Sequence, residues 1–263
     1  YSIHYVYDTY ALSRGTGKAV VDSGKKTWFF VTADYAFGHT LERDTTEVVV
    51  ANGGKVLGGV KHPINTTDFS SFMAQAQASK AEVIGLANAG GDTIGSVKQA
   101  AELGIMGSKQ TVVPLLMFTS DIQALGLKQT AGMTFTEGWY WDYNDANRKF
   151  AERFMKEFKG KAPTSVQAGV YSATMQYLKA VEATKTDNSD AVMKQLKSVE
   201  INDGLFKGKI RADGKFEHDM YLLEVKSPSE SKGPNDVAKV AKVIAAKDAT
   251  LPLSQSKCKL VTN

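Results

Sequence analysis

The sequence predicts an α/β fold built around a parallel sheet, and three observations support this prediction. First, β-branched and aromatic segments alternate with amphipathic segments over the first 137 residues. This alternation, with short connections, is typical of parallel strands that carry helices on both faces. Second, 43% of the 263 residues are hydrophobic and 23% are charged, as in ordinary globular proteins. Third, no apolar run approaches the ~18–20 residues of a membrane-spanning helix.

Five segments in this first part have the composition of buried strands. β-branched and aromatic residues fill the first of them, Lys26-Thr-Trp-Phe-Phe-Val-Thr32, while the second is weaker. The expected strands cover residues 26–32, 55–60, 82–87, 112–118 and 133–137.

Helical segments are expected between these strands. The first ends at Gly53-Gly54, a pair typical of a helix C-cap and turn. Asp68 is expected to cap the second, which has apolar side chains on one face. The expected helices cover residues 37–52, 68–79 and 92–104, with a short helix after Asp121.

After residue 137 the pattern changes from alternation to helices followed by strands. Helices are expected over residues 144–158 and 165–184, and a third helix is expected to begin at a cap formed by Ser189. A further helix is expected over residues 235–247 of the tail. Two hairpin strands, residues 206–211 and 220–226, are expected around the Asp213-Gly214 turn. Residues 144–200 contain almost no strand, so their helices need a sheet that this chain does not visibly contain. At the start of this region, Asn144 or Asp145 is expected to cap a helix, which is favoured over a catalytic pairing of Asp142 with Asp145.

In parallel α/β sheets, ligands bind beyond the carboxyl ends of the strands. Three such ends are polar and rich in glycine or tyrosine, as a cleft wall would be: residues 32–35, 87–90 and 118–120. Aromatic side chains there would bury a flat ligand while their polar atoms orient it. We therefore expect ligand contacts at Tyr35 and in the cluster Trp139-Tyr-Trp141. For Tyr5, Tyr7 and Trp28, core packing is at least as well supported.

The patterns that catalysis requires are missing from the sequence. Gly15-Thr-Gly-Lys18 resembles a phosphate loop, but Ala19 stands where that motif needs Ser or Thr, so a helix start is favoured. The four histidines are far apart and Cys258 is the single cysteine, so no metal site is expected. There is no Gly-x-Ser-x-Gly elbow to supply a hydrolase nucleophile. We expect neither a cofactor nor enzymatic activity.

The net charge of +4, from 32 basic and 28 acidic residues, does not indicate nucleic-acid binding. In and just after the expected helix at 144–158, Lys156, Lys159 and Lys161 are interleaved with Glu152 and Glu157, as on a solvated helix face. No nucleic-acid partner is expected.

Four separated motifs resemble those of periplasmic substrate-binding proteins of ABC importers. They are Tyr7-Asp-Thr-Tyr-Ala11, Thr32-Ala-Asp-Tyr-Ala-Phe-Gly38, Ile210-Arg-Ala-Asp-Gly214 and His218-Asp-Met-Tyr-Leu-Leu-Glu-Val-Lys-Ser-Pro228. The resemblance covers nearly the whole chain. It is closest to the branched-chain amino acid type, in the subgroup tied to aromatic acids and related carboxylates.

This resemblance implies two doubly wound parallel-sheet lobes joined by a hinge, the type I periplasmic binding fold. The chain is then expected to start at the first hinge crossing, with the amino-terminal part of lobe one absent. The expected segments are a hinge and lobe-one segment at 1–16, lobe two at 17–137, a lobe-one return at 138–204, lobe-two strands at 205–228 and a tail at 229–263. In this subgroup a cysteine often lies just before the hinge segment, so Cys258 is a disulfide candidate whose partner is not in this chain.

The resemblance also implies where a ligand would bind. The family places an aromatic ring after the first lobe-two strand, which here is Tyr35. Amino-acid binders place an acid against the ligand ammonium where this sequence has Phe118-Thr119, so an aromatic acid is expected rather than an α-amino acid. The expected ligand contacts are Tyr10, Tyr35, Asn88, Ala89, Phe118, Thr119, Trp139, Tyr140 and Trp141.

The function implied is that of an exported, periplasmic, monomeric receptor. It would bind a small carboxylate between its lobes and deliver it to the membrane permease of an ABC importer. Two alternatives stay open: a receptor of the same family for branched-chain or other amino acids or amides, and the ligand-sensing domain of a regulator. An α/β enzyme is a third class, but it lacks a nucleophile, a metal set and a cofactor loop.

Overall fold

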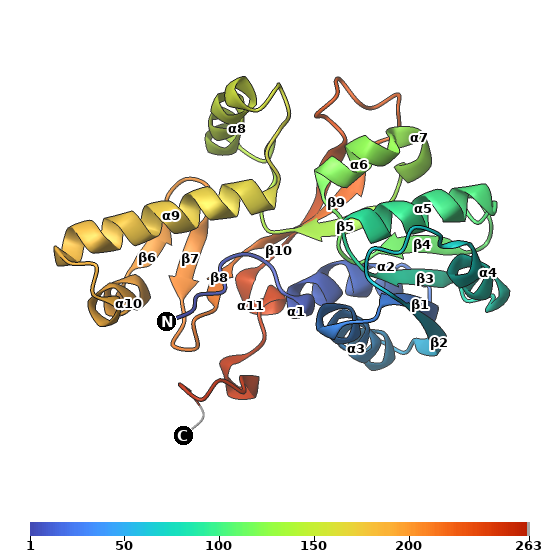
Figure 1. Cartoon of the computed structure of the whole chain (residues 1–263), viewed down its shortest axis with the longest axis horizontal. Helices are drawn as coiled ribbons and strands as arrows, with labels where there is room; N and C mark the ends of the chain where they lie inside the picture. The colour runs from blue at the N-terminus through green and yellow to red at the C-terminus, as the bar shows by residue number, and fades with distance from the viewer. Residues whose placement is uncertain (262–263) are drawn as a thin grey trace. The chain divides into compact units, whose positions relative to one another are not determined.

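The structure, a computed structural model, describes residues 1–261, which form two compact units (Figure 1). Unit 1 contains Tyr1–Asp8, Glu137–Tyr221 and, among the described residues, 243–261. Unit 2 contains Thr9–Thr136 and Leu222–Lys242. The chain therefore passes from one unit to the other four times, and neither unit is a continuous piece of sequence.

A four-stranded sheet forms the centre of unit 2. Its strands are β2 (Lys55–His62), β1 (Thr27–Ala33), β3 (Val83–Ala87) and β4 (Thr111–Pro114), in that order across the sheet. Every neighbouring pair is parallel. All five residues of β3 are buried, as expected for an inner strand that is covered on both faces. The predicted parallel α/β sheet is confirmed.

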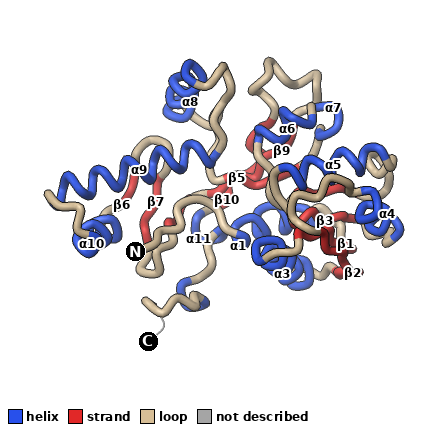
Figure 2. The backbone as a smooth tube through the Cα atoms, viewed as in Figure 1, coloured by secondary structure: helices blue, strands red, loops and turns tan. Residues whose placement is uncertain are grey.

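Helices surround this sheet on both sides (Figures 1 and 2). They are α3 (Ala36–Ala51), α4 (Ser70–Ala78), α5 (Gly91–Glu102), α6 (Thr119–Leu125) and α7 (Leu127–Thr130). A continuous helical run precedes β1, consisting of α1 (Thr9–Leu12), the π-helical turn η1 (Ser13–Gly17) and α2 (Lys18–Asp22). The Gly15-Thr-Gly-Lys18 segment lies inside this run rather than in a phosphate-binding loop.

Several boundaries in unit 2 differ from the prediction by two residues or more, and hydrogen bonds account for two of them. The fourth strand ends at Pro114 instead of residue 118, because its partner β3 ends at Ala87 and the last bond between them joins the Leu115 N–H to the Leu86 carbonyl at 3.1 Å. Helix α4 begins two residues after Asp68, whose carboxylate accepts the Ser70 N–H at 2.8 Å.

Unit 1 contains the helices α8 (Asp145–Glu157), α9 (Ser165–Thr184) and α10 (Ser189–Ser198), as predicted. Asn144 caps α8 by accepting the Asn147 N–H at 2.8 Å, and Asn188, one residue before the expected Ser189, caps α10. Beside these helices, β6 (Glu200–Asn202), β7 (Lys207–Ile210) and β8 (Phe216–His218) form an antiparallel sheet. A short helix, α11 (Ala246–Ala249), and a 3-10 turn, η2 (Leu253–Gln255), follow near the C-terminus.

The prediction of a tail helix is wrong, and the predicted hairpin pairs a different second strand. Strand β7 pairs with β8, whereas the expected partner at 220–226 is a separate strand, β9 (Met220–Val225). Residues 238–244, expected as helix, form β10, and the order β10-β9-β5 makes a third sheet with β5 (Thr134–Glu137). The Lys226 N–H donates to the Val237 carbonyl at 3.0 Å, next to the pairing of β10 with β9. The Ala, Lys and Val pattern of this segment fits helical and extended spacing equally, so the pairing determines that it forms a strand.

The units also divide the C-terminal region differently from the expected segments. Residues 205–221 group with unit 1, because β8 pairs with β7 and β7 pairs with β6. The expected tail at 229–263 is split at Lys242 between the two units.

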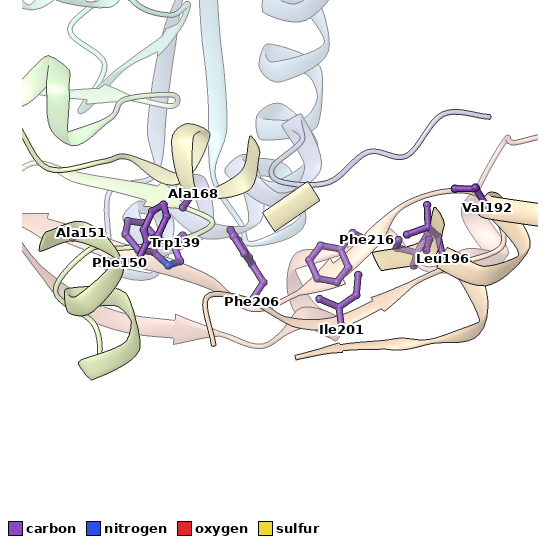
Figure 3. Packing of buried hydrophobic residues seen from close by; sticks show 11 residues of the cluster. Trp139, Phe150, Ala151, Ala168, Val192, Leu196, Ile201, Phe206 and Phe216 are labelled. Carbon is purple, nitrogen blue, oxygen red and sulfur yellow. The ribbon is translucent and has the colours of Figure 1, made fainter. Parts of the chain in front are cut away.

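Unit 1 has its own hydrophobic core, and one helix in it also exposes apolar side chains. Trp139 and Phe216 are fully buried, and Figure 3 shows Trp139 beside Phe150 and Phe216 beside Ile201. Several large apolar side chains of α9 remain exposed: Val166, Val170, Tyr171, Tyr177 and Leu178. These side chains recur at helical spacing and lie on one side of α9.

Among the helices formed by residues 1–261, none is long and apolar enough to cross a lipid bilayer.

Candidate ligand-binding site

The carboxyl ends of β1 and β3 lie side by side in unit 2, because these strands pair in parallel. Tyr35 follows β1, where its N–H donates to the Ala33 carbonyl at 2.8 Å and its backbone starts α3. Its side chain is 42% exposed. Burial, and then the negative charge of Asp92, raise the pKa of the Tyr35 hydroxyl. The turn after β1 and the start of α5 therefore lie within electrostatic reach of each other.

Asn88 directly follows β3, but its side chain is fully buried and bonded inside unit 2. Its Nδ2 donates to His62 Nε2 at 3.2 Å and to Ser96 Oγ at 3.1 Å, while its Oδ1 accepts the Thr93 hydroxyl at 2.9 Å. The structure thus gives Asn88 the role of fixing the turn. The half-buried Ala89 and Gly90 are the more accessible residues of this turn.

Gly90 shapes that turn. Its φ of 57° is in the left-handed region that glycine adopts without strain, and it lies immediately before α5. The Ala89 carbonyl accepts the Asp92 N–H at 3.2 Å, and the Gly90 carbonyl accepts the Ile94 N–H at 3.0 Å. These bonds close the first turn of the helix.

Phe118 and Thr119 begin α6, at the end of the segment that follows β4. The Phe118 N–H donates to Asp121 Oδ2 at 2.9 Å, and burial raises the pKa of this carboxyl. Phe118 is half-buried, whereas Thr119 is 4% exposed. Phe118 is therefore the more accessible of the two.

Tyr10 lies in α1 and does not directly follow a strand. Its ring is half-buried, and the guanidinium carbon of Arg14 lies 5.0 Å from the ring centroid in a cation–π contact. The ring therefore has a packing partner within the same helical run.

The aromatic cluster at 139–141 belongs to unit 1, and much of it is core. Trp139 is fully buried, and its ring meets that of Phe150 edge-on with the ring centroids 5.8 Å apart. Figure 3 shows the two side chains beside each other. Its indole N–H has no hydrogen-bond acceptor among the described residues. Tyr140 is 3% exposed, and its carbonyl accepts Asn147 Nδ2 at 2.8 Å. Trp141 is half-buried and packs against the same hydrophobic cluster.

Sequence reasoning missed a pair of tyrosines next to this cluster. The rings of Tyr143 and Tyr221 lie 4.6 Å apart at 49°, and Tyr143 is 40% exposed. Burial raises the pKa of Tyr221. Tyr221 lies in β9, which the sequence placed in a hairpin with β7, so its pairing with Tyr143 could not be anticipated.

The side chains that the structure assembles suit non-covalent binding. Within residues 1–261, no group of three His, Cys, Asp or Glu side chains is arranged to hold a metal ion. His62 and His218, both buried, are bonded to groups within their own units. The strand ends of unit 2 offer an exposed phenol, a glycine-shaped turn and a half-buried phenyl ring. Aromatic rings of this kind can stack on a small molecule, and the phenol hydroxyl and the backbone of the turn can form hydrogen bonds with it.

A family profile described as "Periplasmic binding protein" matches residues 1–234. A crystal structure of a periplasmic binding protein from Burkholderia mallei is 53% identical, with a TM-score of 0.96 over 99% of this chain and 69% of that one. A branched-chain amino acid ABC transporter periplasmic ligand-binding protein from Burkholderia xenovorans is 34% identical, with a TM-score of 0.87 over 99% of this chain and 70% of that one.

A curated relative is the Leu/Ile/Val-binding protein homolog 6 of Brucella melitensis, which is 28% identical over 198 residues, or 73% of this chain. The chain spans about half, 51%, of the length of that relative. A more distant structure with the same fold is a solute-binding protein from Rhodopseudomonas palustris in complex with 4-hydroxybenzoate. It is 20% identical, with a TM-score of 0.79 over 90% of this chain and 65% of that one.

Proposed function

Because the chain belongs to the periplasmic binding protein family, we propose that it is a periplasmic receptor that delivers a small ligand to the membrane permease of an ABC importer. In such a receptor, ligand binding shifts an equilibrium between conformations, and the loaded conformation docks on the permease. We infer that the receptor is a monomer that performs no covalent chemistry.

The ligand that we propose is an aromatic carboxylate. The observation that carries this proposal is the exposed Tyr35 phenol after β1, with the half-buried Phe118 at the end of the segment after β4, which is two strands from β1 in the same sheet. Rings of this kind bury a flat apolar ligand. The nearby Asp121 carboxylate is buried and already accepts the Phe118 N–H, so it is a poor partner for a ligand ammonium. The complex of the distant Rhodopseudomonas palustris protein with 4-hydroxybenzoate is consistent with this ligand class.

A branched-chain amino acid is the second candidate. Asp92 favours it, because its negative charge lies within electrostatic reach of Tyr35 and would attract a ligand ammonium, although this carboxylate, like that of Asp121, is buried and accepts a backbone N–H. The branched-chain amino acid type of the 34% identical Burkholderia xenovorans protein points the same way.

Titration calorimetry of the protein with benzoate, 4-hydroxybenzoate, cinnamate, leucine and valine tests both candidates, and recovery of each compound unchanged tests for turnover. A ligand at 100 times its Kd adds about 2.7 kcal/mol of stability, so a thermal-shift screen can precede the calorimetry. Selective binding of the aromatic acids supports the first candidate. Selective binding of leucine or valine replaces it with the second, and no binding of any of these compounds counts against both.

A further inference from the structure

A buried histidine in unit 2 joins the two turns that carry the predicted ligand contacts. His62 is the last residue of β2 and is fully buried. Its backbone carbonyl accepts the N–H of Asp34 at 2.7 Å, directly before Tyr35. Its ring Nε2 lies 3.2 Å from Asn88 Nδ2, at the start of the turn after β3. One residue thus binds the end of β1 with its backbone and the end of β3 with its side chain.

The hydrogen bonds around His62 define its tautomer. Nδ1 lies 2.8 Å from the Pro63 carbonyl, which can only accept, so Nδ1 carries the proton. Nε2 is then an acceptor, as the amide of Asn88 requires. Ring packing holds this orientation, since the ring centroids of Phe69 and Phe72 lie 4.8 Å and 5.8 Å from that of His62.

The network continues through Asn88 into helix α5. The second proton of its amide goes to Ser96 Oγ, whose own hydroxyl donates to the Asp92 carbonyl at 2.7 Å. The side chain of Asp92 accepts the N–H of Asn65 at 3.2 Å, which ties the start of α5 to the loop after β2. Each donor of the Asn88 amide has an acceptor, and its oxygen accepts from Thr93.

We propose that His62 is a positioning residue that sets the spacing between Tyr35 and the Ala89–Gly90 turn, and so sets ligand affinity without touching the ligand. This inference rests on the proposed function. Without an acceptor at Nε2, the buried amide of Asn88 must turn or lose a hydrogen bond, and the turn that it fixes moves with it.

Two substitutions distinguish the effect of the hydrogen bond to Asn88 from the effect of the volume of the His62 side chain. His62→Gln offers an amide oxygen that can accept from Asn88, whereas His62→Leu fills the space without an acceptor. Val48→Ala serves as a matched control, because Val48 is 1% exposed near the far end of α3 and its truncation lowers stability away from the strand ends. The Kd values for 4-hydroxybenzoate and leucine, measured by calorimetry, are the readout.

We expect His62→Leu to weaken binding of the compound that the wild-type protein takes by about tenfold, and His62→Gln to stay within about threefold of wild type. Val48→Ala should melt at a lower temperature with an unchanged Kd. The imidazole nitrogen spectrum of the wild-type protein should show a protonated Nδ1 and an unprotonated Nε2 for His62.

Two outcomes overturn the inference: a folded His62→Leu variant that binds as tightly as wild type, or equal losses in His62→Leu and His62→Gln. If the wild-type protein binds none of the tested aromatic acids and amino acids, the proposed function fails instead. The tautomer spectrum still tests the network in that case, since a protonated Nε2 contradicts it.

Discussion

Gly15 lies so close to Thr136 that a β-carbon at Gly15 would be 2.2 Å from the threonine hydroxyl oxygen. The neighbouring Thr16 hydroxyl is 2.9 Å from the same oxygen. This contact joins the π-helical turn at the start of unit 2 to strand β5. It explains why glycine occupies a position that, in a helix, would otherwise favour alanine.

Gly15→Ala should therefore destabilise the protein by about 1–3 kcal/mol, because Thr136 is buried and β-branched and cannot move aside. Denaturant unfolding measures the effect. Gly233→Ala is the control, since nothing lies within 4 Å of a β-carbon there. Adding Thr136→Ala should recover part of the loss, and a Gly15→Ala variant as stable as wild type would contradict this close packing.

The turn between β7 and β8 is held by a buried ion pair. Arg211 Nε donates to Asp213 Oδ1 at 3.0 Å and Nη2 donates to Oδ2 at 2.5 Å, with side chains 10% and 7% exposed. These bonds lower the pKa of Asp213. A carboxyl whose pKa is lowered by folding contributes stability above its unfolded pKa, and the contribution is lost as the pH falls through the folded pKa.

Asp213→Asn should thus reduce stability by about 1–3 kcal/mol at pH 7, with the difference from wild type shrinking below about pH 4. Unfolding in urea at several pH values gives the comparison. Asp22→Asn breaks an exposed pair with Lys18 and should change stability by at most about 0.5 kcal/mol. An Asp213→Asn effect that does not decline in acid would argue against the ion pair as its cause.

His218 predicts a second loss of stability in acid, with the same sign as that of Asp213 but beginning at a higher pH. Burial lowers its pKa to about 4, although its Nδ1 lies 2.7 Å from the Asp219 carbonyl. The unfolded chain, with an ordinary histidine pKa of about 6.5, binds this proton first as the pH falls. As the pH falls from about 6.5 to about 4, the free energy of unfolding should therefore decrease, by about 3 kcal/mol at most.

His218→Gln should flatten this part of the stability profile. Val192→Ala, another substitution in the core of unit 1, should lower stability at every pH and leave the slope in place. Thermal unfolding scans from pH 4 to pH 8 provide the profile. If His218→Gln keeps the wild-type slope, other groups cause it.

Tyr35→Ala should weaken ligand binding by about 1–3 kcal/mol if its ring stacks on the ligand. Tyr35→Phe keeps the ring and should retain most of the affinity, which separates stacking from hydrogen bonding by the hydroxyl. Calorimetry with the compound selected by the screen measures both. Unchanged affinity in Tyr35→Ala would remove this residue from the site.

Much of unit 2 could be predicted because its strands are short, apolar and separated by clear turn signals. Strand β1 and helix α3 match their predicted ranges to within one residue at each end. Residues 238–244 were misread because alanine, lysine and valine satisfy helical and extended spacing alike, and only pairing with β9 decides between them.

The sequence was enough to propose positions for the candidate site, but not to predict the direction of its side chains. The carboxyl ends of parallel strands are where ligands bind, so residues 35, 88–89 and 118–119 could be chosen from the strand pattern. Whether Asn88 turns inward depends on His62, which is 26 residues away in sequence. The placement of Trp139 in the core depends in the same way on Phe150. Such distant contacts leave no local signature.

The discontinuity of unit 1 determines when it can be completed during synthesis. Its first segment pairs with a much later one, since the Phe216 N–H donates to the His4 carbonyl at 3.0 Å. In addition, Arg211 Nη1 donates to the carbonyl of Leu251, 40 residues later in the chain, at 2.7 Å. A growing chain that has not reached Leu251 cannot form all of these bonds, so unit 1 assembles late and through contacts of high sequence separation, which slow folding. Most of unit 2 lies within Thr9–Thr136, so its central sheet can form before the last segment of unit 1 has been synthesised.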